Sequence, residues 1–147
     1  MSRTIQTKAY GPVVIDELQC LEFPDGLLGF EEYKNFALLD AHKKPFFWLQ
    51  SLDDPQIAFI LIKPSIFRDD YDPGVSLADL ESIQVEKLED CLVFAIVTIP
   101  DSGPMTANLQ GPLYINRRNR QGKQFVSPSD EFRTKHDILE EMASRRE

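Results

Sequence analysis

Few residues of this sequence belong to the types that do acid–base, nucleophilic or metal chemistry. His42 and His136 are the only histidines, and neither stands in an HExxH or CxxC spacing that binds a metal. Cys20 and Cys91 are the only cysteines, and each sits among apolar residues. No GxSxG elbow and no phosphate-binding loop occurs. We therefore interpret the histidines as surface residues and the cysteines as reduced, buried thiols. We expect no catalytic residue, no metal and no cofactor.

Two acidic clusters are candidates for calcium binding or acid–base catalysis. Asp53-Asp54 precedes a proline, and Asp69-Asp70-Tyr71-Asp72 precedes Pro73-Gly74. Asp before Pro is typical of turns, because the side chain accepts hydrogen bonds from nearby backbone amides. We interpret both clusters as turns. A small hydrolase that uses the acidic pairs is an alternative, and it would need two converging carboxylates with raised pKa values in a concave pocket.

One basic stretch is the only nucleic-acid-like signal, and it contains Arg117, Arg118, Arg120 and Lys123. A small RNA-binding β-barrel is therefore a second alternative, which would need these side chains to align with exposed aromatic residues across a sheet. The overall charge disfavours it. Lys and Arg number 16 and Asp and Glu number 24, a net charge of −8, and an acidic chain is repelled by phosphate backbones. We expect no direct nucleic-acid partner, and a basic protein as the better electrostatic match.

The length and composition are those of one ordinary globular domain. The chain has 147 residues, with 42% hydrophobic and 27% charged residues. No stretch approaches the roughly 18 apolar residues of a membrane span, and the N-terminus lacks an apolar signal region. We expect a single domain over residues 1–147, located in the cytosol, with no membrane partner.

Short apolar runs separated by ten spread prolines predict a mainly β fold. The predicted strands are Val13–Ile15, Gln19–Phe23, Phe36–Leu39, Phe46–Leu52, Ile57–Ile62, Leu92–Ile99, Leu113–Ile115 and Gln124–Val126, with a hairpin turn at Arg120–Lys123. Many short strands and little helix favour a single-domain antiparallel β-barrel-like fold.

Only two segments are typical of helices. Ser76–Glu81 begins with a serine that can cap the helix and has acidic residues in its first turn. The tail Asp137–Arg146 is rich in helix formers but only weakly amphipathic, so the last 10–15 residues are expected to form a helix that frays.

Three motifs are not explained by composition. The first is Phe23–Glu31, with sequence FPDGLLGFE, and the second is Pro45–Pro55, with an aromatic–Leu–Gln–Ser strand. The third is Met105–Asn116, which contains Thr–x–Asn–Leu and ends in Ile–Asn. In order and spacing, from about Val14 to Val126, they resemble the FliW family of bacterial flagellar assembly factors. One departure is Leu28, where the family usually has proline; leucine restores a backbone N–H and frees φ, which predicts a less rigid loop.

The resemblance implies a cytosolic, non-enzymatic protein of motile bacteria with two protein partners. One is newly made flagellin, bound near its C-terminus. The other is the RNA-binding translational regulator CsrA, whose repression of flagellin mRNA would be relieved. Export of flagellin would free the protein for the regulator.

Binding surfaces tend to lie on loops held by a rigid scaffold, so two motif loops are the candidate partner-binding site. The candidate residues are Pro24, Asp25, Gly26, Leu27, Leu28, Gly29, Phe30 and Glu31 in the first loop, and Met105, Thr106, Asn108, Leu109 and Pro112 in the second. A structural role is the alternative for several motif residues. The glycines would supply positive φ, Phe23, Phe30, Phe36 and Trp48 would be core, and Asn108 and Asn116 would bond backbone at strand ends.

Overall fold

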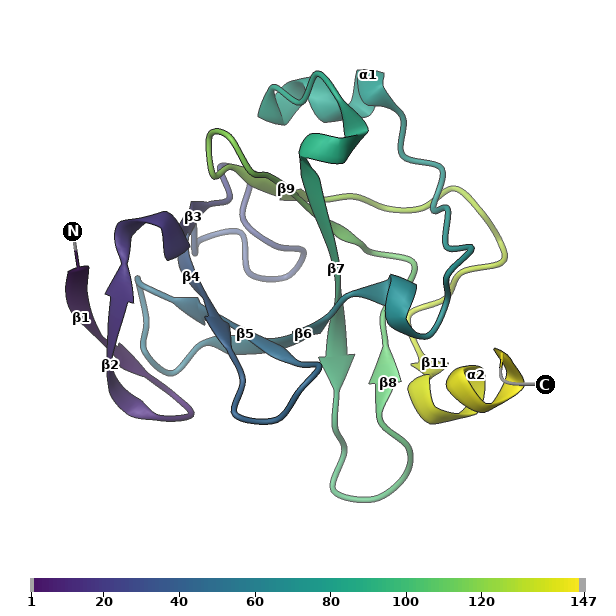
Figure 1. Cartoon of the computed structure of the whole chain (residues 1–147), viewed down its shortest axis with the longest axis horizontal. Helices are drawn as coiled ribbons and strands as arrows, with labels where there is room; N and C mark the ends of the chain where they lie inside the picture. Colours follow the sequence, from purple (N-terminus) through teal and green to yellow (C-terminus); the bar gives the residue numbers. More distant parts are fainter. Residues whose placement is uncertain (1, 146–147) are drawn as a thin grey trace.

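The computed structural model describes residues 2–145, and these form two antiparallel sheets with two short α-helices. Strands β1 (Ser2–Thr7) and β2 (Gly11–Asp16) pair as a separate hairpin. The larger sheet follows the order β10-β9-β7-β6-β5-β4-β3, and β8 and β11 branch from β7 (Figure 1). The remaining strands are β3 (Cys20–Glu22), β4 (Asn35–Asp40), β5 (Phe47–Ser51), β6 (Ala58–Ile62), β7 (Cys91–Thr98), β8 (Thr106–Ala107), β9 (Leu113–Asn116), β10 (Gly122–Gln124) and β11 (His136–Asp137).

The mainly β prediction is confirmed, but closure into a barrel is not. The two ends of the large sheet, β3 and β10, approach each other at one isolated bridge between Glu22 and Gln121. There the N–H of Glu22 donates to the carbonyl of Arg120 at 2.9 Å. This single contact does not continue as a ladder, so the sheet curls without closing. We call the junction of β3 and β10 the seam.

Side-chain packing at the seam explains why the two ends come together. Phe23 is completely buried in the main core with Phe36, Leu49 and Phe94. A Cβ on Gly122 would lie 2.6 Å from atoms of the Phe23 ring. The absence of a side chain at Gly122 therefore lets β10 lie directly against this ring. The burial of Phe23 and Phe36 confirms their core role.

The β9–β10 hairpin was predicted with its turn too late in the sequence. The turn occupies residues 117–119, and Gly122 and Lys123 lie in β10. Asparagine chemistry sets this position, because Asn116 Oδ1 accepts from the Arg118 N–H at 2.9 Å and Asn119 Oδ1 accepts from the Gln121 N–H at 3.0 Å. Strands β1, β8 and β11 were not predicted; β1 is mostly polar and the other two have two residues each.

Both predicted helices are present. Helix α1 (Leu77–Leu80) begins with a capping box in which Ser76 Oγ accepts from the Asp79 N–H and Asp79 Oδ2 accepts from the Ser76 N–H. Helix α2 (Ile138–Arg145) forms the tail, and Arg146 of the predicted segment lies outside the described residues. Neither helix, nor any other within residues 2–145, is long and apolar enough to cross a membrane.

Replacing Gly122 with alanine is expected to lower the free energy of unfolding by about 1–3 kcal/mol, because the new methyl group overpacks the seam against Phe23. Urea unfolding of the full chain measures this cost. In a Phe23→Leu background the same substitution should cost less, since the smaller side chain leaves room. An equal cost in both backgrounds would contradict the seam packing.

Candidate functional site

The first candidate loop, Pro24–Glu31, connects β3 to β4 and is held by its own backbone. The Gly26 N–H donates to the Phe23 carbonyl at 2.8 Å, and the Phe30 N–H donates to the Leu27 carbonyl at 2.7 Å. Lys34 Nζ donates to the carbonyls of Pro24 and Glu31 at 3.1 and 2.9 Å. The loop is therefore a fixed structure.

Some residues of this loop serve the fold. Gly26 has φ +68°, and a Cβ there would lie 2.5 Å from the Glu31 backbone, so glycine is required. Leu27 is buried, and Phe30 packs edge-on against Phe59 with ring centroids 5.0 Å apart. The exposed residues are Pro24, Asp25, Leu28, Gly29 and Glu31.

The second candidate loop, Met105–Pro112, lies deeper. Leu109 and Pro112 are buried, and the Leu109 carbonyl accepts from the Tyr71 hydroxyl at 2.5 Å. Asn108 Oδ1 accepts from the N–H groups of Gln110 and Gly111 at 3.0 and 2.9 Å, which confirms its structural role. Met105, Thr106 and Asn108 are partly accessible.

Gln124 of β10 joins the two loops. Its Oε1 accepts from the Leu28 N–H at 2.9 Å, and its Nε2 donates to the Gly111 carbonyl at 3.0 Å. The backbone N–H that leucine restores at position 28 thus bonds the loop to β10. Lys123 adds a second tie, an ion pair to Asp25 at 3.3 Å. Sequence reasoning missed Gln124 because it was treated only as a strand residue.

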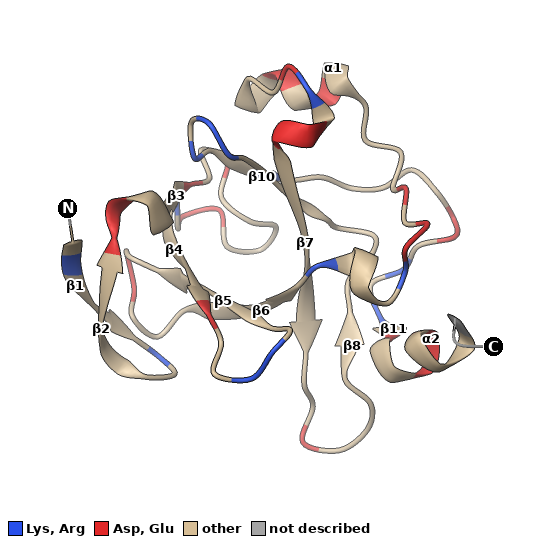
Figure 2. Cartoon of the chain, viewed as in Figure 1, with Lys and Arg blue, Asp and Glu red and all other residues tan. Residues whose placement is uncertain are grey.

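The exposed residues of the first loop, which we call the loop surface, are Pro24, Asp25, Leu28, Gly29 and Glu31, and two of them are carboxylates. Glu31 Oε2 accepts from the Gly29 N–H at 3.1 Å, and this hydrogen bond holds the pKa of Glu31 below its ordinary value. Lys34 and Lys123 contact this loop, and other basic residues gather at the β9–β10 and β4–β5 turns (Figure 2). The loop surface therefore suits a basic partner.

An apolar groove of about 500 Å³ lies at another place, between the β4–β5 hairpin and helix α2. Its walls include apolar side chains from five parts of the chain, namely Tyr10, Phe46, Trp48, Ile60, Met105 and Met142. The Tyr10 hydroxyl accepts from the His42 N–H at 2.9 Å and from Trp48 Nε1 at 3.1 Å. These bonds hold the β1–β2 hairpin against the β4–β5 hairpin, so one wall of the groove is fixed.

Helix α2 forms the opposite wall and is held by a partly buried polar network. Glu141 accepts from Arg68 Nη1 at 2.7 Å and contacts His136 Nδ1 at 2.8 Å. His136 Nε2 accepts from the Arg133 N–H at 2.8 Å, so the ring hydrogen is on Nδ1. His136 is 5% exposed, which makes its prediction as a surface residue wrong. Its place in β11 turns it inward while the adjacent charged residues face outward.

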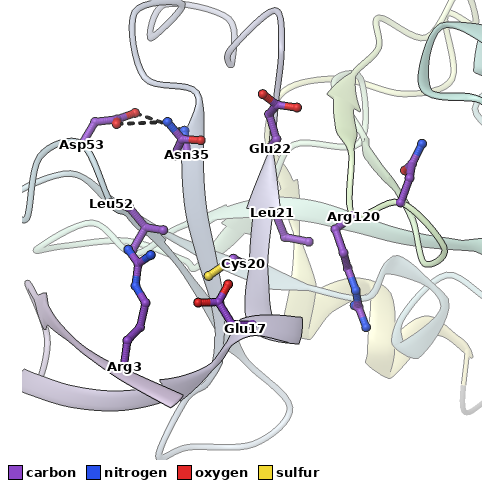
Figure 3. A pocket seen from close by; sticks show the side chains of 10 residues that line it. Arg3, Glu17, Cys20, Leu21, Glu22, Asn35, Leu52, Asp53 and Arg120 are labelled. Carbon is purple, nitrogen blue, oxygen red and sulfur yellow. Dashed lines mark hydrogen bonds between the residues drawn. The ribbon is translucent and has the colours of Figure 1, made fainter. Parts of the chain in front are cut away.

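A third depression, a cleft of about 430 Å³, lies beside β3 (Figure 3). It brings Arg3, Glu17, Cys20 and Asp53 around one space. Asp53 is engaged within the fold, because its carboxylate accepts from the N–H groups of Lys34 and Asn35, and these bonds lower its pKa. Burial raises the pKa of the Cys20 thiol. Neither shift activates the group for acid or nucleophilic catalysis.

The acidic clusters are turns, as interpreted from the sequence. Asp54 Oδ1 accepts from the Gln56 N–H at 2.9 Å, and Asp72 Oδ1 accepts from the Gly74 N–H at 3.0 Å. The lowered pKa of Asp53 is opposite to what the hydrolase alternative requires. Within residues 2–145, no group of three or more His, Cys, Asp or Glu side chains is arranged to hold a metal ion.

The basic stretch and the two cysteines remain to be placed in the structure. Arg118 pairs with Asp90 at 3.2 Å, and Lys123 pairs with Asp25, so two of the cations of the RNA-binding alternative already have carboxylate partners. Cys20 and Cys91 are free thiols, each half-buried where full burial was predicted.

Comparison with known proteins shows which family this chain belongs to. A family model described as "FliW protein" matches residues 4–138. The flagellar assembly factor FliW of Treponema denticola is 52% identical over 139 residues, covering 94% of this chain and 95% of that protein. The protein of the same name from Treponema pallidum is 48% identical, covering 97% and 95%.

A solved structure gives the same result for the fold. The crystal structure of the flagellar assembly factor FliW superposes with a TM-score of 0.84 at 35% identity, covering 92% of this chain and 96% of that one. The fold and the sites define a small, mainly β protein whose candidate sites are a pair of joined loops and an apolar groove. The chain belongs to the FliW family.

Replacing Gln124 with alanine is expected to speed hydrogen exchange at the Leu28 amide by about tenfold, because the bond that protects it is lost. The free energy of unfolding should fall by about 1 kcal/mol. Exchange measured by NMR on the full chain tests this, with Gln56→Ala as a control on an exposed glutamine. An unchanged Leu28 exchange rate would show that Gln124 does not tie the loops.

Replacing Asp53 with asparagine is expected to destabilise the protein by about 1 kcal/mol near pH 7, a value kept low because the side chain is exposed. The lowered pKa of Asp53 means that its stabilisation is present above its ordinary value of 3.8 and is lost as the pH falls through and below it. Wild type and variant should therefore converge at acid pH. A difference that does not depend on pH in urea unfolding would contradict this assignment.

Proposed function

We propose that this protein is a cytoplasmic flagellar assembly factor that acts by binding two proteins, flagellin and a CsrA-type RNA-binding regulator, without catalysis. Membership of the family supports the flagellar role, since the relatives carry that name. We treat residues 1–147 as one functional domain. The observation that carries the binding role is the Gln124 bridge, which combines two separate motif loops into one rigid surface.

The loop surface is the site proposed for the regulator. A rigid loop loses little conformational entropy when a partner binds, which favours affinity. Its exposed carboxylates are Glu31 and Asp25, of which Asp25 is paired with Lys123, and they belong to a chain of net charge −8. A regulator that binds RNA carries a basic face, and opposite charges speed the encounter of two proteins. Binding there relieves repression of flagellin mRNA.

Flagellin is the second partner and controls the supply of the free protein. While flagellin accumulates, it occupies the protein; once flagellin is exported, the protein is free to bind the regulator. Titration calorimetry of the full chain with monomeric flagellin and with the regulator tests both interactions. Release of a labelled flagellin mRNA leader from the regulator tests the functional consequence, and failure to release that RNA would overturn the antagonist role.

Replacing Glu31 with lysine is expected to weaken regulator binding by about tenfold at low salt, because a carboxylate facing a basic partner is reversed. The loss should shrink as salt rises, since exposed charges are screened beyond about 10 Å at 0.1 M. Asp25→Lys should act in the same direction. Flagellin binding should depend less on salt.

Two controls separate charge from structure in this experiment. Glu31→Gln keeps an acceptor for the Gly29 N–H and should lose less affinity than Glu31→Lys. Glu86→Lys reverses an exposed carboxylate outside the loop surface and should leave affinity nearly unchanged. Unchanged regulator affinity of Glu31→Lys, with a normal melting temperature, would remove the loop from the site.

A further inference from the structure

The apolar groove exposes more hydrophobic surface than a stable fold needs. Leu139 on α2 is 66% exposed and Ile99 after β7 is 57% exposed, and both border the groove. Between them lie the side chains of Trp48, Ile60 and Met105. A contiguous apolar patch of this kind marks a place where another molecule binds.

The apolar lining of the groove, which encloses about 500 Å³, suits the apolar face of a helix. Its two long walls, the β4–β5 hairpin and α2, would receive the side chains that an amphipathic helix presents at positions i, i+3, i+4 and i+7. Met105 and Met142 both line the groove, and methionine adapts its shape to different apolar partners.

The charge on the groove lining favours an occupant that carries a negative group. Among the lining residues that the structure describes, Lys43 is the only Lys, Arg, Asp or Glu, and His42 and Lys44 are its neighbours in the β4–β5 turn. Within residues 2–145, Lys43 takes part in no ion pair. On a chain of net charge −8, this turn is a favourable place for a negative group of a partner.

We propose that the groove binds an amphipathic helix whose apolar face carries a carboxylate next to Lys43. This inference rests on the proposed function, so that the helix belongs to flagellin, and it gives flagellin a surface distinct from the loop surface. A second copy of this chain is the less suitable occupant, because two copies of charge −8 repel each other.

The test measures binding of monomeric flagellin from the same bacterium to the full chain and its variants by calorimetry. Leu139→Asp places a charge on the apolar wall and should reduce flagellin affinity at least about tenfold, as for a central contact. Leu18→Asp is the matched control, a leucine that is 64% exposed outside the groove, and it should bind as wild type does. Lys43→Glu should also weaken binding, whereas Lys87→Glu should not.

The outcomes separate this inference from the proposed function. Loss of flagellin binding by Leu139→Asp, with regulator binding retained, supports the groove. Normal flagellin binding by Leu139→Asp overturns the groove while leaving the proposed function in place. Equal losses of flagellin affinity in Leu139→Asp and Leu18→Asp also overturn the groove as the flagellin site. Wild-type dimers in sedimentation that Leu139→Asp abolishes would assign the groove to a second copy and overturn the flagellin helix. No flagellin binding by the wild type would refute the proposed function itself.

Discussion

The close approach of Gly122 to the Phe23 ring is the constraint on which the rest of the structure depends. It brings the last strand of the large sheet, β10, against the first, β3. Because side chains two residues apart in a strand face the same side, Gln124 points the same way as Gly122 and reaches the loop that follows Phe23. One position without a side chain thus places the amide that joins the two motif loops.

The segment Met105–Pro112 connects the two candidate surfaces physically. At one end Met105 lines the apolar groove, and its carbonyl accepts from the Ile138 N–H at the start of α2 at 3.2 Å. At the other end the Gly111 carbonyl accepts from Gln124 beneath the loop surface. A partner that displaces Met105 would act on a segment held at both ends.

The sequence predicted the local structure better than the long-range contacts. Apolar runs such as Leu92–Ile99 located the central strands, and Ser76 located a helix, because these signals are local. The prediction of a turn at Arg120–Lys123 was wrong because the side chains of Asn116 and Asn119 set the position of the hairpin turn. The burial of His136 and the role of Gln124 depend on partners far away in the chain, Arg68 by way of Glu141 and Leu28, and no local pattern reveals such pairs. The groove was missed for the same reason, since its walls come from five segments.

The central claim is that two protein partners bind to two different surfaces of one β scaffold. Hydrogen exchange of the full chain, measured alone, with flagellin and with the regulator, tests it most directly. The account predicts that flagellin protects the amides of residues 99–105 and 138–142 around the groove, and that the regulator protects residues 24–31 of the loop surface. Protection of one and the same set of amides by both partners, or protection away from both surfaces, would contradict it.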